Sequence, residues 1–135
     1  MKKKIVILGS TGSIGKTTFS ILKKNKNFFN IKLLTTNRNI KELIKQSKTF
    51  NVKNLIVTDK KQFLIAKKIL KNKKIKIFNN FNSLNKIFKK KVDYTMSSIS
   101  GFEGLEPTLN MIRFSKKIAI ANKEAIICGW NLINK

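Results

Sequence analysis

Short apolar runs alternate along this chain with segments that have the periodicity of amphipathic helices. Ile5–Leu8 is a continuous apolar run, as expected for a parallel strand that is covered on both faces. Lys74 and Lys76 accompany the fourth such run, which favours an edge position for that strand. The remaining runs predict strands at residues 31–36, 55–57, 75–78, 94–99 and 118–121.

The segments between these runs predict helices with one apolar face each. A short helix is expected within residues 82–91, a helix with Pro107 in its first turn follows a turn at residues 101–104, and another helix begins at Lys123. The faces expected for the first three helices are Ile14, Thr18, Ile21 and Leu22; Ile40, Leu43, Ile44 and Ser47; and Phe63, Ala66, Ile69 and Leu70.

Strands separated by helices of about ten residues are typical of βαβ units and therefore of a parallel sheet. No repeat or linker divides the chain. We predict one Rossmann-like, doubly wound α/β domain over residues 1–135, with a mostly parallel sheet and helices on both faces. Helical periodicity still continues at Trp130 and Ile133, without a cap, when the sequence stops at Lys135. Either an ordinary terminal helix or the start of a second domain is expected there.

The charge balance is strongly basic, with 30 Lys and Arg against 6 Asp and Glu and a net charge of +24. A hydrophobic fraction of 41%, including 10 Phe, opposes disorder. Arginine, which forks onto phosphates and base edges, occurs only at Arg38 and Arg113, and the lysines are scattered. We therefore favour a solvated basic surface. Non-specific, salt-sensitive binding of nucleic acid through charge remains the alternative.

Cysteine and histidine usage limits the possible chemistry. Cys128 is the only cysteine and histidine is absent, which excludes an internal disulfide, a His/Cys zinc site and a His-based catalytic triad. No apolar run approaches the roughly 18 residues of a membrane span. The run after Lys2–Lys4 is too short for a signal peptide. We expect a reducing, cytoplasmic setting away from the membrane.

Three glycines form the sequence GSTGSIG between the first strand and the first helix. In this position Gly9 permits the tight turn, Gly12 lets the backbone approach a pyrophosphate, and Gly15 lets the helix pack closely on the strand. The free amides of the helix start would then meet the phosphates. The spacing is GxxGxxG rather than GxGxxG, so a purely structural turn stays open as an alternative. A P-loop requires glycine where the chain has Ser10, which disfavours a nucleoside triphosphatase.

The second strand indicates which dinucleotide would bind. An NAD site places an acidic residue about 20 residues after the glycines, where it binds the ribose 2′-hydroxyl. Residues 34–39 contain no acid but include Arg38, whose guanidinium can bind a 2′-phosphate as a fork. This favours NADP(H) over NAD(H), with an ordinary surface arginine as the alternative.

Three segments together resemble the 1-deoxy-D-xylulose 5-phosphate reductoisomerase family: GSTGSIG at residues 9–15, SGFEGLEPTL at residues 100–109 and IAIANKEAI at residues 118–126. The resemblance spans nearly the whole chain and covers the family's N-terminal NADPH-binding domain. The residues to which it assigns roles are Thr11, Gly12, Ser13 and Ile14 at the NADPH phosphates and ribose, Asn37, Arg38 and Asn39 at the 2′-phosphate, Asn122 and Glu124 beside the nicotinamide, and Lys123 towards the substrate. Asn37 and Ala125 depart from the residues usual in the family.

The resemblance also implies a reaction. Members isomerise 1-deoxy-D-xylulose 5-phosphate and reduce it with NADPH to 2-C-methyl-D-erythritol 4-phosphate, an isoprenoid precursor. They act as homodimers and use a divalent cation (Mg²⁺ or Mn²⁺), whose carboxylate ligands lie in a D-x-E segment just beyond the position of Lys135. We therefore expect this chain to lack the catalytic residues, the metal ligands and the C-terminal helical domain, and to bind cofactor without catalysis. A basic module that binds nucleic acid, or another Rossmann enzyme, remains the alternative.

Overall fold

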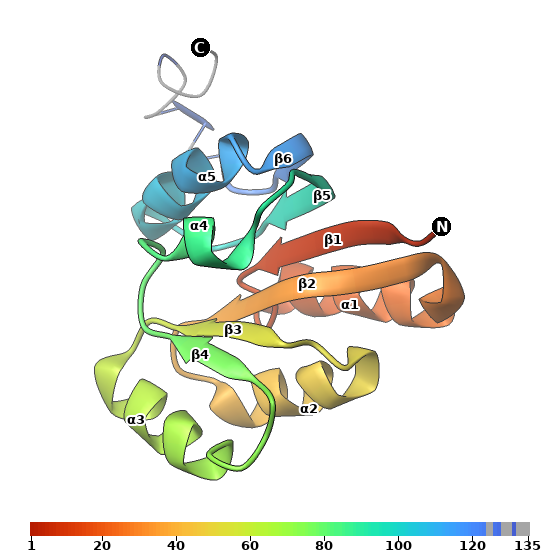
Figure 1. Cartoon of the computed structure of the whole chain (residues 1–135). Coiled ribbons are helices and arrows are strands. Elements are labelled where there is room, and N and C mark those ends of the chain that lie inside the picture. Colours follow the sequence, from red (N-terminus) through yellow and green to blue (C-terminus); the bar gives the residue numbers. More distant parts are fainter. Residues whose placement is uncertain (124–125, 128–130, 132–135) are drawn as a thin grey trace.

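The computed structural model describes residues 1–123, 126, 127 and 131. Its strands form one six-stranded sheet in which every neighbouring pair is parallel (Figure 1). The strands are β1 (Lys3–Leu8), β2 (Phe29–Thr36), β3 (Asn54–Val57), β4 (Lys76–Phe78), β5 (Val92–Ser97) and β6 (Ser115–Ile120). The helices are α1 (Ser13–Lys24), α2 (Ile40–Phe50), α3 (Lys60–Ile69), α4 (Leu84–Ile87) and α5 (Leu105–Ile112), with 3-10 turns η1 (Lys26–Phe28) and η2 (Phe102–Gly104).

The order of strands in the sheet is β4-β3-β2-β1-β5-β6. The chain builds outward from β1 through β4 and then returns to place β5 and β6 on the other side of β1. Such a reversal leaves a crevice at the carboxyl ends of the two strands that flank it, here β1 and β5. The predicted doubly wound, Rossmann-like fold is confirmed, and β4 lies at a sheet edge as its flanking lysines indicated.

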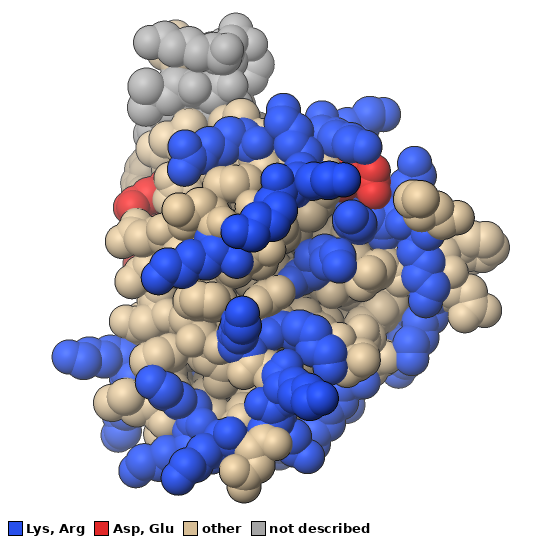
Figure 2. Space-filling model, viewed as in Figure 1, with Lys and Arg blue, Asp and Glu red and all other residues tan. Residues whose placement is uncertain are grey.

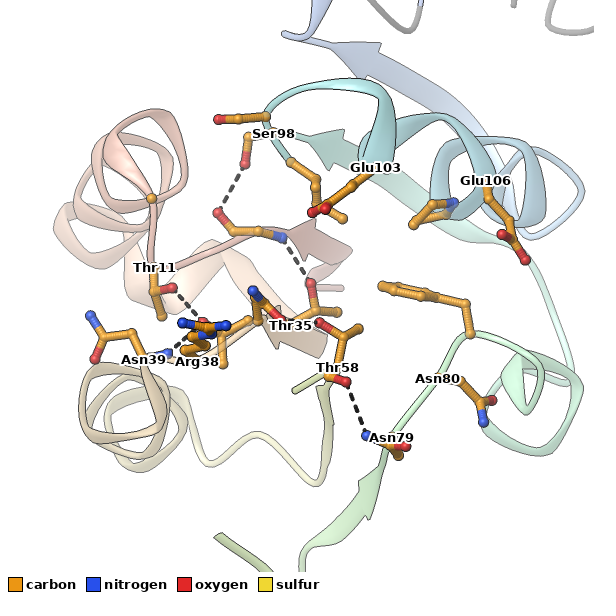
Figure 3. Close-up of a pocket in the computed structure, with 18 of the residues that line it drawn as sticks. Thr11, Thr35, Arg38, Asn39, Thr58, Asn79, Asn80, Ser98, Glu103 and Glu106 are labelled. Carbon is orange, nitrogen blue, oxygen red and sulfur yellow. Dashed lines mark hydrogen bonds between the residues drawn. The ribbon is translucent and has the colours of Figure 1, made fainter. Parts of the chain in front are cut away.

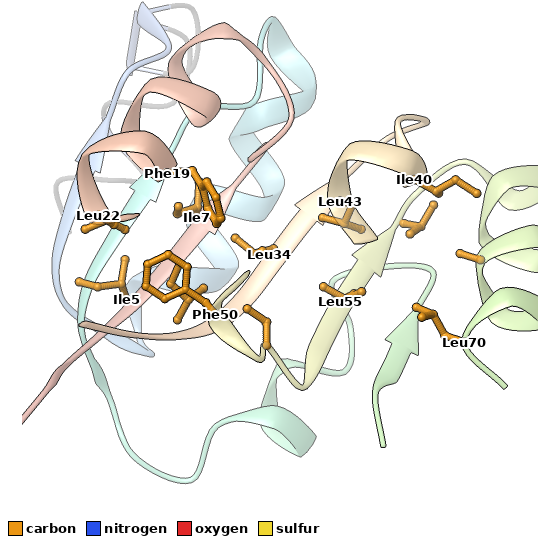
Figure 4. Close-up of a cluster of buried hydrophobic side chains, with 14 residues drawn as sticks. Ile5, Ile7, Phe19, Leu22, Leu34, Ile40, Leu43, Phe50, Leu55 and Leu70 are labelled. Carbon is orange, nitrogen blue, oxygen red and sulfur yellow. The ribbon is translucent and has the colours of Figure 1, made fainter. Parts of the chain in front are cut away.

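Apolar side chains cover both faces of the sheet. In β1, Ile5 and Ile7 belong to a cluster with α1, α2 and α3, whereas Val6 and Leu8 belong to a cluster with α4 and α5. Figure 4 shows the first cluster, in which the rings of Phe19 and Phe50 meet edge to face with centroids 5.3 Å apart. The alternation explains why β1 reads as a continuous apolar run.

The buried face of α1 differs from the one that the sequence predicts. Gly15, Phe19 and Leu22 face the sheet, while Ile14 and Ile21 are 49% and 58% exposed. The reason is the contact at Gly15, where a Cβ would lie 2.1 Å from the carbonyl oxygen of Gly9. This close approach fixes the rotation of the helix about its axis, so the residues four and seven positions after Gly15 turn inward.

Other elements differ from the prediction mainly at their ends. β5 ends at Ser97 rather than residue 99, which leaves Ser98 and Ile99 to the loop that follows it. The helix expected within residues 82–91 is only the single turn of α4. At the end of α3, Ile69 is 57% exposed although Ala66 and the C-cap residue Leu70 are buried. Most of the helix expected after Lys123, including Trp130, lies outside the described residues.

Candidate functional site: a pocket at the carboxyl edge of the sheet

A cavity of about 830 Å³ opens at the carboxyl edge of the sheet, at the crevice that the strand order predicts (Figure 3). Its walls come from the turns after β1, β2, β3 and β4, and from residues 98–107 after β5. Cavities that bind small molecules typically measure about 300–1,000 Å³. Five successive strand ends therefore contribute to one space of a size that suits a cofactor.

The three glycines of the turn after β1 are in different environments. Gly9 has a φ of 74°, a left-handed conformation that favours glycine. Gly15 has backbone atoms where a Cβ would be. At Gly12, by contrast, a Cβ would meet only the carbonyl oxygen of Gly9 at 3.8 Å. The packing of the chain therefore does not require glycine at position 12, where the backbone faces the cavity.

Hydrogen bonds from β2 and α2 hold this turn in place. The Thr35 hydroxyl accepts from the backbone N–H of Gly9 at 2.8 Å, and the hydroxyls of Thr11 and Thr36 share a bond of 2.6 Å. The buried amide of Gln46 donates to the carbonyl oxygen of Ser10 at 3.0 Å. Sequence reasoning missed these three supports. A glutamine among the apolar positions of α2 was the available signal for one of them.

The start of α1 lacks a side-chain cap. Gly12 occupies the N-cap position and has no side chain to accept a hydrogen bond from the first turn. The first amides of a helix have no partner within the helix, and together with the helix dipole they favour a bound anion. At this end of α1 they stand beside the cavity, because Thr11 and Gly12 line it. The side chains of Ser13 and Ile14 are exposed at the same end.

The turn after β2 brings Asn37, Arg38 and Asn39 to the cavity wall. The Arg38 side chain is 77% exposed, and its Nε lies 3.5 Å from Oδ1 of Asp59. Asp59 follows β3, so it is brought to Arg38 by the pairing of β2 with β3 rather than by sequence proximity. Sequence reasoning did not place this carboxylate beside the guanidinium. Asn39 caps α2 by accepting from the N–H of Glu42 at 3.2 Å.

On the far side of β1, the segment after β5 is held by close backbone packing. A Cβ at Gly104 would lie 2.6 Å from the carbonyl oxygen of Ile99, so the loop can close only with glycine there. The buried amide of Asn122 donates to the same oxygen at 2.6 Å and to the carbonyl oxygen of Gly101. Asn122 thus joins the end of β6 to the wall of the cavity.

The family resemblance also singled out two residues that follow β6 in the sequence. Lys123 is exposed, and Glu124 lies outside the described residues. Within the described ranges, no group of three or more His, Cys, Asp or Glu side chains could hold a metal ion. The residues in view therefore do not fit a metal centre, although Glu103 and Glu106 both line the cavity.

On the face seen in Figure 2, lysines and arginines far outnumber acidic residues and are spread over the surface rather than gathered in one groove. None of the helices in the described part of the chain is long and apolar enough to cross a membrane.

Comparisons with known proteins agree with this geometry. The curated 1-deoxy-D-xylulose 5-phosphate reductoisomerase of Pelagibacter ubique is 64% identical over 135 residues, which are 98% of this chain and 35% of that protein. A solved structure of the Zymomonas mobilis reductoisomerase in complex with NADPH is 31% identical, with a TM-score of 0.87 over 99% of this chain and 36% of that one. A further reductoisomerase structure, in complex with magnesium, is 25% identical with a TM-score of 0.86, over 99% of this chain and 34% of that one.

The chain thus spans about a third of the length of the relatives that it matches. Nothing in the comparisons supports the nucleic-acid alternative. A sequence model of one family matches residues 5–129, which include the glycine turn, the loop after β5 and the residues after β6. The chain therefore belongs to the 1-deoxy-D-xylulose 5-phosphate reductoisomerase family.

Proposed function

We propose that residues 1–135 form the NADPH-binding domain of a 1-deoxy-D-xylulose 5-phosphate reductoisomerase. The observation that carries the proposal is the combination of an uncapped helix start, an open backbone at Gly12 and an exposed guanidinium at Arg38 around one cavity. The diphosphate of the cofactor would bind along the turn, and its 2′-phosphate would bind Arg38. The relative solved in complex with NADPH supports this assignment.

The residues present fit the cofactor. Space above Gly12 admits a phosphate oxygen close to the main chain, since a Cβ there would meet only one atom, at 3.8 Å. Residues 34–39 carry no acid that would repel a 2′-phosphate. The Arg38 side chain uses Nε towards Asp59, which leaves its two terminal amino groups for a forked contact with phosphate. We assign Thr11, Gly12, Ser13 and Ile14 to the diphosphate and Asn37, Arg38 and Asn39 to the 2′-phosphate.

The remaining assignments concern the other end of the cofactor. Asn122 and Glu124 would lie near the nicotinamide. Asn122 would also hold the loop after β5 in position, through its hydrogen bonds to the carbonyl oxygens of Ile99 and Gly101. Lys123 would reach the phosphorylated substrate. When bound, NADPH supplies the hydride for reduction of the rearranged sugar phosphate. The residues of this chain bind and orient the cofactor at the carboxyl edge of the sheet. We assign the complete isomerisation and reduction, and homodimer formation, to the whole protein and only cofactor binding to this chain.

A parallel titration with NADPH and NADH tests the proposal. We expect the purified chain to bind NADPH more tightly than NADH. Arg38→Asp should weaken NADPH binding by roughly tenfold or more, because a charge-assisted pair becomes a repulsion, and should leave NADH binding little changed. Arg113→Asp is the matched control, since it makes the same change of charge at the only other arginine, which lies outside the cavity.

Two results would contradict the proposal. If neither dinucleotide binds, the cavity is not a cofactor site. If Arg38→Asp weakens NADPH and NADH equally, or no more than Arg113→Asp does, Arg38 does not contact the 2′-phosphate.

A further inference from the structure

A carboxylate points into the cavity from the wall opposite Arg38. The chain has only 6 Asp and Glu against 30 Lys and Arg, yet Glu103 and Glu106 both line this space. In Figure 3, Glu103 projects from η2 into the cavity, and Glu106 lies farther along the same wall. The two ion pairs found among the described residues are Arg38–Asp59 and Lys116–Asp93, so the Glu103 carboxylate forms no ion pair with a described lysine or arginine.

The strand order fixes which end of a bound dinucleotide would lie near Glu103, given the proposed function. β2 and β5 flank β1 on opposite sides. A cofactor with its 2′-phosphate at Arg38, after β2, and its diphosphate at the turn after β1 must extend its nicotinamide towards the loop after β5. The wall there consists of Ser98, Ile99 and Ser100, followed by Glu103.

The nicotinamide is the part of the cofactor whose charge changes in the reaction. Its reduced ring is neutral, whereas the oxidised ring is a pyridinium cation. A carboxylate nearby attracts the cation and has no comparable attraction for the neutral ring. The repulsion between the same carboxylate and the cofactor phosphates is common to both forms, so it cancels in a comparison of the two.

We infer that Glu103 is a specificity-determining residue that favours NADP⁺ over NADPH at this site. Because binding and redox equilibria are linked, tighter binding of the oxidised form makes the bound cofactor a stronger hydride donor. Each tenfold of preference lowers the midpoint potential of the bound two-electron couple by about 30 mV. A carboxylate in this wall thus assists the reduction that the whole protein carries out.

The ratio of the NADP⁺ and NADPH dissociation constants, measured by calorimetry on the purified chain, tests this inference. In Glu103→Gln we expect NADP⁺ to lose roughly three- to tenfold more affinity than NADPH, as suits one partly solvated charge contact. Glu103→Asp should retain part of the preference. Glu42→Gln is the charge-matched control, because Glu42 lies in the first turn of α2 on the Arg38 side, and it should leave the ratio unchanged.

An unchanged ratio in Glu103→Gln, with both forms still bound, overturns the inference and leaves the proposed function standing. The same holds if Glu42→Gln shifts the ratio as much as Glu103→Gln does, because general charge would then explain the effect. If the unchanged chain binds neither NADP⁺ nor NADPH, the inference and the proposed function both fail.

Discussion

Helices α1, α2 and α3 all start at the same edge of the sheet. They differ in whether a side chain accepts hydrogen bonds from the free backbone amides of the first turn. Asn39 caps α2 through the N–H of Glu42 at 3.2 Å, and Asp59 caps α3 through the N–H of Gln62 at 3.0 Å. α1 follows Gly12 and has no side-chain cap. Caps of this kind stabilise a helix by about 0.5–2 kcal/mol. α1 forgoes that stabilisation at the one helix start where an anion is proposed to bind.

Packing anchors α1 instead of a cap. Phe19 and Leu22 are buried against the sheet, and Gly15 brings the helix into contact with the backbone of the glycine turn. A helix start that binds an anion must keep its amides free and must still be held in place. The contrast shows that different residues can meet these two requirements. Glycine at the N-cap leaves the amides available, and glycine one turn later lets tertiary contacts hold the helix in place.

The largest expected effect comes from removing that anchor. Gly15→Ala places a Cβ 2.1 Å from the carbonyl oxygen of Gly9 and 2.7 Å from Cα of Ser10. Alanine normally stabilises a helix by about 1 kcal/mol relative to glycine, but this overlap with backbone should reverse the sign and cost about 3 kcal/mol or more. Urea unfolding measures the change. A variant as stable as the parent would show that the close contact does not fix α1.

A smaller effect is expected when α1 is given the cap that α2 and α3 possess. A Cβ at Gly12 meets only one atom, at 3.8 Å, and the carboxylate of Gly12→Asp can accept from the first turn, so the free energy of unfolding should rise by a few tenths of a kcal/mol. NADPH affinity should fall at least roughly tenfold, because the new carboxylate occupies the amides and repels phosphate. Calorimetric titration and urea unfolding measure the two changes.

The reverse exchange at α3 is the control for this prediction. Asp59→Gly removes a cap and should lower the free energy of unfolding by a few tenths of a kcal/mol. If Gly12→Asp instead binds NADPH as tightly as the parent, the amides of α1 are not the phosphate site, and the contrast between the helix starts has no functional meaning.

The smallest expected effect concerns Asp93. Its side chain accepts from a backbone N–H at the start of β1, as the caps of α2 and α3 do at the starts of those helices. Oδ2 of Asp93 accepts from the N–H of Lys4 at 2.8 Å, and this bond, together with nearby Lys116, holds the pKa of Asp93 below its ordinary value of 3.8. A carboxyl whose pKa is lowered by folding stabilises the fold above its ordinary pKa and loses that contribution as the pH falls through the lowered value.

We therefore expect the stability difference between the parent and Asp93→Asn to be constant from neutral pH down to about pH 5 and to shrink as the pH falls below about 4. Urea unfolding across this range measures it. The change should be slight because the carboxylate is close to solvent. A difference that stays the same down to pH 2 would show that the bond to Lys4 does not perturb Asp93.

Much of the fold and part of the site could be predicted from local patterns. Ile5–Leu8 indicated a strand buried on both faces, and the glycines at 9, 12 and 15 indicated a strand-to-helix turn. The lysines around β4 indicated an edge. These signals are local, because the period of apolar residues and the conformational freedom of glycine act within a few residues of sequence. The family resemblance added the assignments near Asn122, which no local pattern carries.

Tertiary structure alone decided which residues meet across the sheet. Asp59 reaches Arg38 because β2 and β3 pair, Gln46 reaches Ser10 because α2 packs behind the turn, and Glu103 enters the cavity because β5 lies beside β1. The same holds for Ile14 and Ile21, whose exposure follows from the contact at Gly15 rather than from their hydrophobicity. The sequence by itself determined the order and type of most elements and the glycine turn after β1. Their side-chain partners depend on strand order and helix rotation, which long-range packing sets.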